Sequence, residues 1–267
     1  MQTRTSVSPT IQQTIDSVLL ARKVKIDFFT VPELMVNEAT PLLLINDGQD
    51  MEKLALAEML LGMYRLNSLQ PILCVAIHAG SDRKMEYGTA SQPDYLGRGA
   101  RAAHYRDFVI TELLPHIQQH FRVKHFQEMA FAGFSLGGLS ALDIVWHHPH
   151  LFSKAGVFSG SFWWRKKAYE DGYDNDRDRI MHQLIRKGFA ASHLRFFFQC
   201  GLLDETADRN NNGIIDSVED TRDMIQELKA KGYNEEQIRY YEMKDGAHNV
   251  ETWATAMPHF LKWGWGK

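Results

Sequence analysis

The feature that most constrains this chain is the segment 133–137, which reads Gly-Phe-Ser-Leu-Gly. A short apolar run, 128–132, precedes it, and an apolar-periodic stretch, 139–148, follows it and stops at Pro149. This pattern predicts a strand, a sharp turn and a helix. The glycines fit that prediction, because a strand and a helix that approach so closely leave no room for side chains beside Ser135.

The sequence G-x-S-x-G at a strand-to-helix turn is typical of a nucleophile elbow, which holds a serine hydroxyl exposed above a sheet. The motif alone is common, and a glycine-rich turn with an ordinary exposed serine is the alternative. A serine nucleophile also needs a base and an acid, so the rest of the chain must supply a histidine and a carboxylate.

Composition narrows the class of protein. The chain has 267 residues, 44% of them apolar, which is enough for one large α/β domain or two small ones. Its net charge of −3 gives no basic signature, so we expect no nucleic-acid partner. No apolar run is long enough to span a membrane, and the N-terminus lacks the pattern of a signal peptide. We therefore expect a cytoplasmic protein with no membrane partner, or a periplasmic or secreted one if a leader was removed.

Strands and helices alternate along most of the chain, which predicts an α/β three-layer sandwich with a mostly parallel sheet of about eight strands. We treat residues 1–267 as a single domain without a large lid. The expected strands are 14–20, 24–31, 41–45, 71–78, 128–132, 154–158, 194–199 and 237–242. The expected helices are 51–66, 105–120, 139–148, 177–187, 220–231 and 252–264. The first two dozen residues form either an arm across a partner or part of the sheet.

The last two expected strands end in side chains that could complete a triad with Ser135. Asp204 follows the seventh strand and His248 follows the eighth, which gives the chain order Ser, Asp, His. A histidine can take the serine's proton near neutral pH, and a buried carboxylate holds the imidazole in the required tautomer. We assign that carboxylate to Asp204. Competing acids near the strand ends are Glu205, Asp208 and Asp245.

An oxyanion hole needs two backbone N–H groups that point to the developing negative charge. The residue after the nucleophile, Leu136, supplies one of them. We expect the other from the loop after the third strand, where Gln49 is the candidate and Gly48 permits the turn.

Two other groups of reactive side chains have simpler interpretations. Cys74 and Cys200 lie in apolar, strand-like runs, so we expect reduced core thiols rather than a disulfide or a catalytic cysteine. His147, His148 and His150 cluster around a proline. A metal site is conceivable there, but no carboxylate or cysteine completes a ligand set, and a solvated helix end explains the cluster.

Four segments carry a resemblance to a known family. They are 46–49 (Asn-Asp-Gly-Gln), 133–138 (Gly-Phe-Ser-Leu-Gly-Gly), 158–164 (Phe-Ser-Gly-Ser-Phe-Trp-Trp) and 246–248 (Gly-Ala-His). Together they resemble the esterase D or enterochelin-esterase-like group of α/β-hydrolases, which includes feruloyl esterases and mycolyl transferases. The resemblance covers about residues 24–264. It implies a lidless α/β-hydrolase domain that cleaves esters through an acyl-enzyme, and it supports Ser135, Asp204 and His248 as the triad. It does not fix the substrate, because members act on very different esters.

One segment departs from the usual pattern of that group. Residues 208–219 match the 12-residue calcium loop D-x-[DN]-x-[DN]-G-x5-E at every position. The expected oxygen ligands are Asp208, Asn210, Asn212, the carbonyl of Ile214, Asp216 and Glu219. A helix is expected after the loop but not before it, so we predict an isolated structural Ca²⁺ site that holds the loop carrying Asp204. The alternative is an Asn/Asp-rich turn that binds no ion.

Aromatic and basic residues suggest a substrate class. Trp163 and Trp164 follow the sixth expected strand, and with Arg98 they could contact a sugar or an aromatic acyl group. Other basic residues of the same segments are Arg101, Arg165, Lys166 and Lys167. A basic, aromatic cleft would suit an anionic or phenolic ester such as a catecholate or ferulate. The alternative is that the tryptophans belong to the core and the charges to a solvated face.

The sequence thus predicts a serine esterase that acts on a small-molecule ester of aromatic, carbohydrate-linked or siderophore type, without an organic cofactor. Its oligomeric state stays open. Two other function classes also stay open: an acyltransferase on the same scaffold, and a non-catalytic binding module. An intact serine, acid, histidine and Asp-Gly-Gln loop argues against the last of these.

Overall fold

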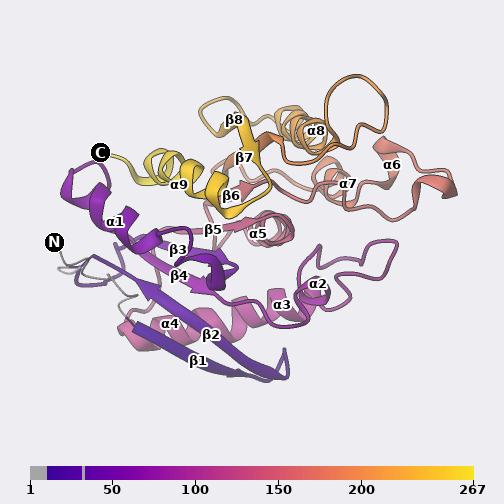
Figure 1. Ribbon diagram of the computed structural model, residues 1–267. Helices are drawn as coiled ribbons and strands as arrows, with labels where there is room; N and C mark the ends of the chain where they lie inside the picture. Colours follow the sequence, from indigo (N-terminus) through magenta and orange to yellow (C-terminus); the bar gives the residue numbers. More distant parts are fainter. Residues whose placement is uncertain (1–10, 32–33) are drawn as a thin grey trace.

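A computed structural model of the protein describes residues 11–31 and 34–267. Its centre is an eight-stranded sheet with the order β1-β2-β4-β3-β5-β6-β7-β8 (Figure 1). The β1–β2 and β2–β4 pairs are antiparallel, and every other pair is parallel. The strands are β1 (Ile11–Ser17), β2 (Arg22–Phe29), β3 (Leu42–Asn46), β4 (Leu73–Ile77), β5 (Met129–Phe134), β6 (Lys154–Phe158), β7 (Arg195–Leu203) and β8 (Ile238–Ala247). The predicted mostly parallel eight-stranded sheet is therefore confirmed.

Helices cover both faces of the sheet and make three layers (Figure 1). On one face, α3, α4, α5, α7 and α8 enclose the larger apolar cluster, and on the other face α1 and α9 enclose the second. The longer helices are α1 (Leu56–Arg65), α3 (Ala102–Phe108), α4 (Leu114–Phe121), α5 (Leu136–His147), α7 (Ile180–Lys187), α8 (Asp216–Ala230) and α9 (Val250–Trp265). The short ones are η1 (Gly48–Asp50), α2 (Arg83–Glu86), the π-helical turn η2 (Val109–Leu113), η3 (Tyr169–Asp171) and α6 (Asn175–Asp178). Burial on both faces explains why the central strands are continuously apolar.

Several boundaries differ from the predicted ones. Residues 11–17 form an antiparallel edge strand, so this part of the N-terminal segment belongs to the sheet, and residues 1–10 lie outside the described chain. β8 continues further than expected, to Ala247, and α8 begins earlier, at Asp216. The segment 79–103, for which no helix or strand was expected, contains α2 and the start of α3.

The position of β5 brings the candidate residues to one place. This strand lies between β3 and β6 in the middle of the sheet. Because β3 to β8 run parallel, their carboxyl ends lie along one edge, and the loops that follow them meet there. These loops carry Gln49, Ser135, Ser161, Asp204 and His248.

Side-chain polarity separates the interior from the surface. Cys74 in β4 and Cys200 in β7 are both buried, and desolvation raises the pKa of each thiol.

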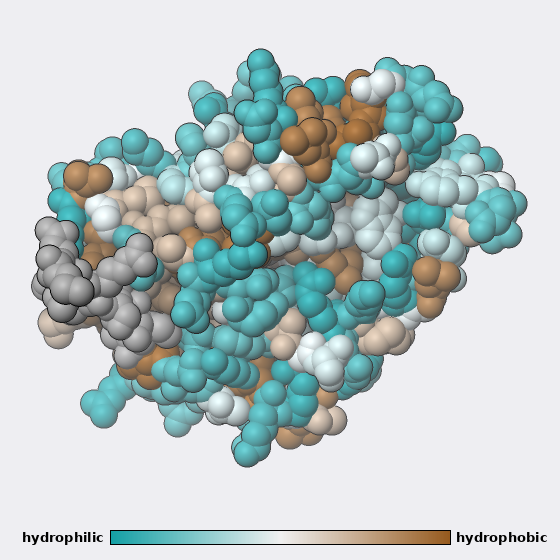
Figure 2. All heavy atoms as spheres, in the orientation of Figure 1, coloured by the Kyte–Doolittle hydropathy of each residue, from teal (hydrophilic) through white to brown (hydrophobic). Residues whose placement is uncertain are grey.

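Figure 2 shows one face of the molecule, on which hydrophilic side chains predominate and apolar ones form separate areas. Across residues 11–31 and 34–267, no helix is long and apolar enough to cross a bilayer.

The close approach of β5 and α5 can be tested with Gly133→Ala. A Cβ at position 133 would lie 2.3 Å from the carbonyl oxygen of Gly137, so the strand and helix would have to separate. We expect Tm, measured by circular dichroism, to fall by several degrees.

Gly62→Ala is the matched control, because nothing lies within 4 Å of a Cβ at that position of α1. Alanine is favoured over glycine inside a helix by about 1 kcal/mol, so this variant should keep or raise Tm. Equal Tm values for the two variants would show that the approach of β5 and α5 is not a constraint.

Candidate active site

Ser135 occupies the strained turn that the sequence predicts between β5 and α5. Its backbone has φ 53° and ψ −121°, a conformation that costs a non-glycine residue of order 1–3 kcal/mol. Its N–H donates to the carbonyl of Phe158 at 2.8 Å, which ties the turn to the end of β6. A Cβ at Gly138 would lie 2.9 Å from the carbonyl oxygen of Gly133, so this glycine is also required by space. The turn therefore presents a serine hydroxyl at the carboxyl edge of the sheet.

Ser161 contacts the candidate nucleophile directly, which the sequence analysis missed. Its hydroxyl lies 3.3 Å from Ser135 Oγ, and its N–H donates to the Ser135 carbonyl at 3.2 Å. The residue is 2% exposed. The sequence did contain a signal, since Ser161 is the second serine of the segment 158–164 that follows β6. We infer that it fixes the resting orientation of the Ser135 hydroxyl.

Asp204 and His248 meet at the ends of β7 and β8. One carboxylate oxygen of Asp204, whose side chain is fully buried, lies 3.9 Å from His248 Nδ1. The same oxygen accepts from the Cys200 thiol at 3.4 Å, and the other has no hydrogen-bond donor among the described residues. The separation from His248 exceeds a hydrogen bond, as is common in apo sites whose catalytic contacts tighten when substrate binds.

The competing acids point elsewhere. Glu205 accepts from the N–H of Ser217 at 2.6 Å at the start of α8, and burial raises the pKa of its carboxyl group. Asp208 accepts two backbone N–H groups of its own loop. Asp245 is exposed on β8. Of the four acids, Asp204 is the one placed against His248.

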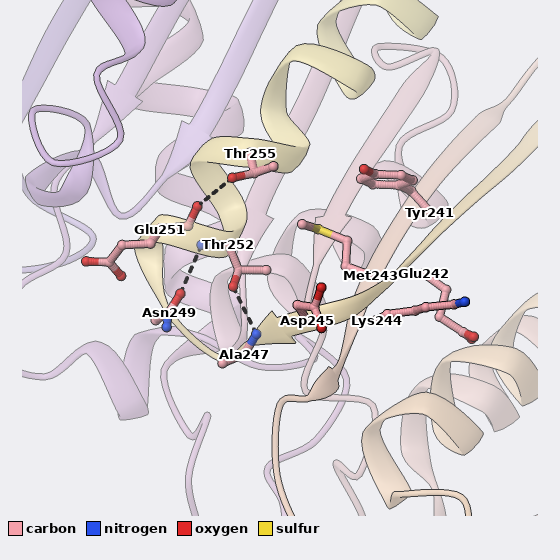
Figure 3. Close-up of a pocket in the computed structure, with 10 residues that line it drawn as sticks. All are labelled: Tyr241, Glu242, Met243, Lys244, Asp245, Ala247, Asn249, Glu251, Thr252 and Thr255. Atoms are coloured by element: carbon pink, nitrogen blue, oxygen red, sulfur yellow. Dashed lines mark hydrogen bonds between the residues drawn. The ribbon is translucent and has the colours of Figure 1, made fainter.

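The segment around His248 is held by the first turn of α9 (Figure 3). The Ala247 N–H donates to the Thr252 hydroxyl at 2.9 Å, and the Asn249 side chain caps the helix by accepting the Thr252 N–H at 2.9 Å. The His248 ring meets the Trp253 ring edge-on, with centroids 5.4 Å apart. An open groove of about 580 Å³ lies between β8 and α9, but neither Ser135 nor His248 lines it, so we do not assign it to the substrate.

The two expected oxyanion donors, Leu136 and Gln49, both follow strands that end at the carboxyl edge of the sheet. Leu136 is the first residue of α5, where a backbone N–H has no partner within the helix. Gln49 belongs to η1, the turn after β3, and its side chain accepts from the Ala79 N–H and donates to Asp47, both at 3.1 Å. The side chain thus fixes the loop and leaves the backbone N–H as the group that could serve the oxyanion.

A buried ion pair holds the oxyanion loop against the elbow. Asp47, 1% exposed and with φ 64°, accepts two hydrogen bonds from Arg83, at 2.6 and 2.7 Å. A Cβ at Gly137 would lie 2.6 Å from the Asp47 carboxylate, so this carboxylate packs directly on the elbow. The pairing joins residues 36 positions apart, which no sequence pattern announced.

The residues expected to bind substrate divide into two groups. Trp164 is fully buried, packs against Gly88 and Gly99, and donates to Thr89 at 3.2 Å. Its expected role in a substrate cleft is therefore wrong, and the alternative, a core residue, is correct. Trp163 is partly exposed, and the Arg98 guanidinium lies 4.7 Å from its ring.

Arg98 does not provide a free positive charge. Its guanidinium pairs with Asp94, whose side chain is fully buried. The same Asp94 carboxylate accepts the N–H groups of Leu96 and Arg98, at 3.0 and 2.9 Å, which closes a tight turn. The Arg98 charge is therefore matched by Asp94, and its guanidinium lies over the Trp163 ring.

Some of the residues expected to bind calcium in the loop 208–219 contact one another, and others do not. Asp208 accepts the N–H groups of Asn212 and Gly213 at 3.1 and 2.8 Å, and the amides of Asn210 and Asn212 both reach one oxygen of Glu219, at 2.7 and 2.8 Å. Asp216 instead turns to Arg209. In the described part of the chain, no three histidine, cysteine or acidic side chains are gathered closely enough to hold a metal ion by themselves. The histidine cluster around Pro149 therefore forms no such group either. His147 instead lies with its ring Nδ1 2.8 Å from the Asp143 carbonyl oxygen of its own helix.

Comparisons with known proteins identify a family and a shared fold. A family model described as "Putative esterase" matches residues 17–263. "Uncharacterized protein YbbA" of Bacillus subtilis (strain 168) is 23% identical over 231 residues, which cover 85% of this chain and 86% of that protein.

Two solved esterases have the same fold. Enterochelin esterase from Shigella flexneri has a TM-score of 0.73 and 20% identity, and the match covers 95% of this chain and 57% of that one. A ferulic acid esterase has a TM-score of 0.69 and 18% identity, and the match covers 94% and 95% of the two chains. This chain therefore spans little more than half the length of the enterochelin esterase.

Arg83→Met would leave the Asp47 carboxylate buried without its partner. Such a loss costs about 3–5 kcal/mol in a fully buried pair, and because Arg83 is 30% exposed we expect about 2 kcal/mol. Urea denaturation measures this change. The double variant Arg83→Met/Asp47→Asn should regain much of the loss, because it removes both charges.

Arg106→Met is the control, since Arg106 is equally exposed but pairs with a surface carboxylate, Asp107. We expect less than about 0.5 kcal/mol there. The same loss for Arg83→Met and Arg106→Met would contradict the role assigned to the Asp47 pair.

Proposed function

Because the chain belongs to the "Putative esterase" family and is an esterase, we propose that it cleaves carboxylic esters with Ser135 as nucleophile. The observation that carries the proposal is the strained backbone of Ser135, φ 53° and ψ −121°, at the tip of the β5–α5 turn. Strain of this kind persists only where the surrounding structure imposes it, and it exposes the hydroxyl to a substrate. Asp204 and His248 lie at the strand ends beside it.

The proposed reaction has two halves. The Ser135 hydroxyl turns away from Ser161, gives its proton to His248 and attacks the ester carbonyl. The N–H groups of Leu136 and Gln49 stabilise the oxyanion of the tetrahedral intermediate, and the alcohol leaves with the proton from His248. Water then attacks the acyl-enzyme by the same route and releases the acid. Asp204, buried and paired with no cation other than His248 among the described residues, stabilises the imidazolium in both halves.

We propose an ester with an aromatic group, of the carbohydrate-linked or siderophore type, as the substrate. Trp163, partly exposed and stacked on Arg98, supplies an aromatic surface near the nucleophile. Two structural neighbours are named as an enterochelin esterase and a ferulic acid esterase, and ferulic acid is an aromatic acid.

A fluorophosphonate probe tests the nucleophile. It should label the wild-type protein and not Ser135→Ala, and hydrolysis of short aryl esters should fall at least about 1,000-fold in that variant. Ser68→Ala is the matched control, because the Ser68 hydroxyl only bonds the Met63 carbonyl, far along the chain from the elbow.

Two outcomes would change the assignment. Labelling of Ser135→Ala at the wild-type rate would refute Ser135 as nucleophile, and a wild-type protein that neither reacts nor hydrolyses esters would favour a non-catalytic module. If added acceptor alcohols were converted to esters faster than acid is released, the protein would be an acyltransferase.

We also propose that the loop 208–219 binds a structural Ca²⁺ ion. Its complete match to the calcium-loop pattern is supported by the convergence of Asn210, Asn212 and Glu219 and by the left-handed Gly213, with φ 83°. The amides point their N–H groups at Glu219 and would present their oxygens to a cation after a simple flip. Asp216, held by Arg209, would contribute through water, which is common at this loop position.

Calcium should raise the stability of the protein. At about 100 times its Kd, a ligand adds about 2.7 kcal/mol to the free energy of unfolding, so Tm should rise by several degrees and fall again with a chelator. Glu219→Gln should remove most of this response. Glu236→Gln, at an exposed position, is the control and should keep it. A wild-type Tm that ignores both calcium and chelator would refute the site.

A further inference from the structure

Arg165 is a buried cation enclosed by tyrosines. The residue is 9% exposed, and its guanidinium carbon lies 4.7, 4.0 and 5.7 Å from the ring centroids of Tyr95, Tyr169 and Tyr173. One nitrogen donates to the Tyr95 hydroxyl at 3.3 Å. The Nε atom is buried and has no acceptor among the described residues. The sequence left open whether Arg165 faces solvent, and the structure shows that it does not.

The other buried arginines have carboxylate partners, and Arg165 does not. Arg179, 3% exposed, pairs with Asp220 and Asp223 at 2.7 and 2.8 Å. Arg209 pairs with Asp216 and Glu219 of the loop 208–219 and with Asp220, the residue after that loop. Within residues 11–31 and 34–267, no carboxylate oxygen lies within 4.0 Å of the Arg165 guanidinium. The negative faces of three rings stabilise its charge only in part, so the site retains an unmatched positive charge.

The cage also offers neutral hydrogen-bond donors. Burial raises the pKa of Tyr169 and of Tyr173, so both hydroxyl groups keep their protons at physiological pH. Neither hydroxyl donates a hydrogen bond within residues 11–31 and 34–267. Tyr169 is 45% exposed, which opens the cage to solvent on its side. One guanidinium and adjacent O–H groups form a receptor for an anion.

The charge of the cage selects the kind of anion. Arg165 contributes a single charge, and the neighbouring Lys166 is directed to Asp178, 3.6 Å away. A dianionic phosphate would therefore be only half neutralised. A phenol or catechol, with a pKa near 10, would arrive mostly uncharged at neutral pH. A carboxylate carries one charge and matches the planar fork of a guanidinium.

The cage lies on the segment that contacts the nucleophile. Ser161, 3.3 Å from the Ser135 hydroxyl, precedes Arg165 by four residues, a distance of at most about 14 Å along the backbone. Trp163, partly exposed, lies between Ser161 and Arg165 in the sequence, and the Tyr95 N–H donates to the Arg165 carbonyl at 3.0 Å. A substrate bound at Ser135 and passing over Trp163 would extend toward the cage.

We propose that Arg165, with Tyr95, Tyr169 and Tyr173, binds a carboxylate carried by the ester substrate at a distance from the scissile bond. This subsite rests on the proposed serine-esterase function and narrows its substrate class to carboxylate-bearing esters.

A series of p-nitrophenyl monoesters of dicarboxylic acids tests the subsite. Each is compared with the neutral p-nitrophenyl ester of the same chain length, and the readout is the ratio of their kcat/KM values. The wild-type ratio should exceed one and peak at the chain length that reaches Arg165. Arg165→Met should lower the peak ratio about 10- to 100-fold, the range expected for one charge-assisted hydrogen-bonded contact. Arg165→Lys should retain part of the preference for the carboxylate-bearing ester, because lysine keeps the positive charge.

Arg195→Met is the matched control. Arg195 also stacks on an aromatic ring, 4.6 Å from the Trp263 centroid, but it begins β7 at the opposite edge of the sheet. Its removal should leave the ratio unchanged. A wild-type ratio of one or less at every length, or a ratio unaffected by Arg165→Met, would overturn the proposal.

Calorimetry separates failure of the subsite from failure of the esterase. Glutarate binding is measured in Ser135→Ala and in Ser135→Ala/Arg165→Met, with Tm as a check on folding. Loss of glutarate binding in the double variant would support the subsite, whether or not the wild-type protein cleaves esters. Absence of ester cleavage would refute only the catalytic proposal. Equal binding in both proteins, or none in either, would overturn the subsite.

Discussion

The site depends on how closely β5 approaches α5. Neither Gly133 nor Gly138 could carry a Cβ without a clash against backbone atoms, so the chain must reverse at Ser135 within a single residue. The resulting left-handed backbone is unfavourable for serine and is offset by hydrogen bonds from outside the turn. Phe158 accepts the Ser135 N–H, and Ser161 donates to the Ser135 carbonyl. The end of β6 therefore holds the elbow in place, which explains why the 158–164 segment belongs to the site.

Two buried carboxylates at the carboxyl edge of the sheet differ in how their charge is matched. Asp47 is neutralised by the two hydrogen bonds from Arg83, so it acts as a structural wedge between the oxyanion loop and Gly137. Asp204 has no arginine or lysine partner in the described structure, and one of its oxygens lacks a donor. Its charge is left to the histidine. The difference comes from pairing and not from burial, since both side chains are buried.

Local patterns predicted the sheet, the elbow and the places of Asp204 and His248, because each depends on residues near in sequence or on chain order. What could not be predicted depends on contacts between distant segments. The pairing of Arg83 with Asp47 spans two loops, and the burial of Trp164 depends on two glycines, Gly88 and Gly99, that leave space for its ring. The sequence could not assign Arg165 to a substrate cleft or to a solvated face, because the tyrosines that enclose it come from separate segments.

One network of ion pairs joins the loop 208–219 to the starts of α7 and α8. Arg209, inside that loop, pairs with Asp220, which also pairs with Arg179 at the start of α7. Burial raises the pKa of Tyr173, which lies over the Arg165 guanidinium, and the negative charge of Asp220 raises it further. On the other side, the Ser217 N–H holds Glu205, the residue after Asp204. The loop thus contacts Glu205, the residue after Asp204, and through Arg209 it contacts the buried carboxylate of Asp220. The turn after β3 is held separately, by the pairing of Asp47 with Arg83.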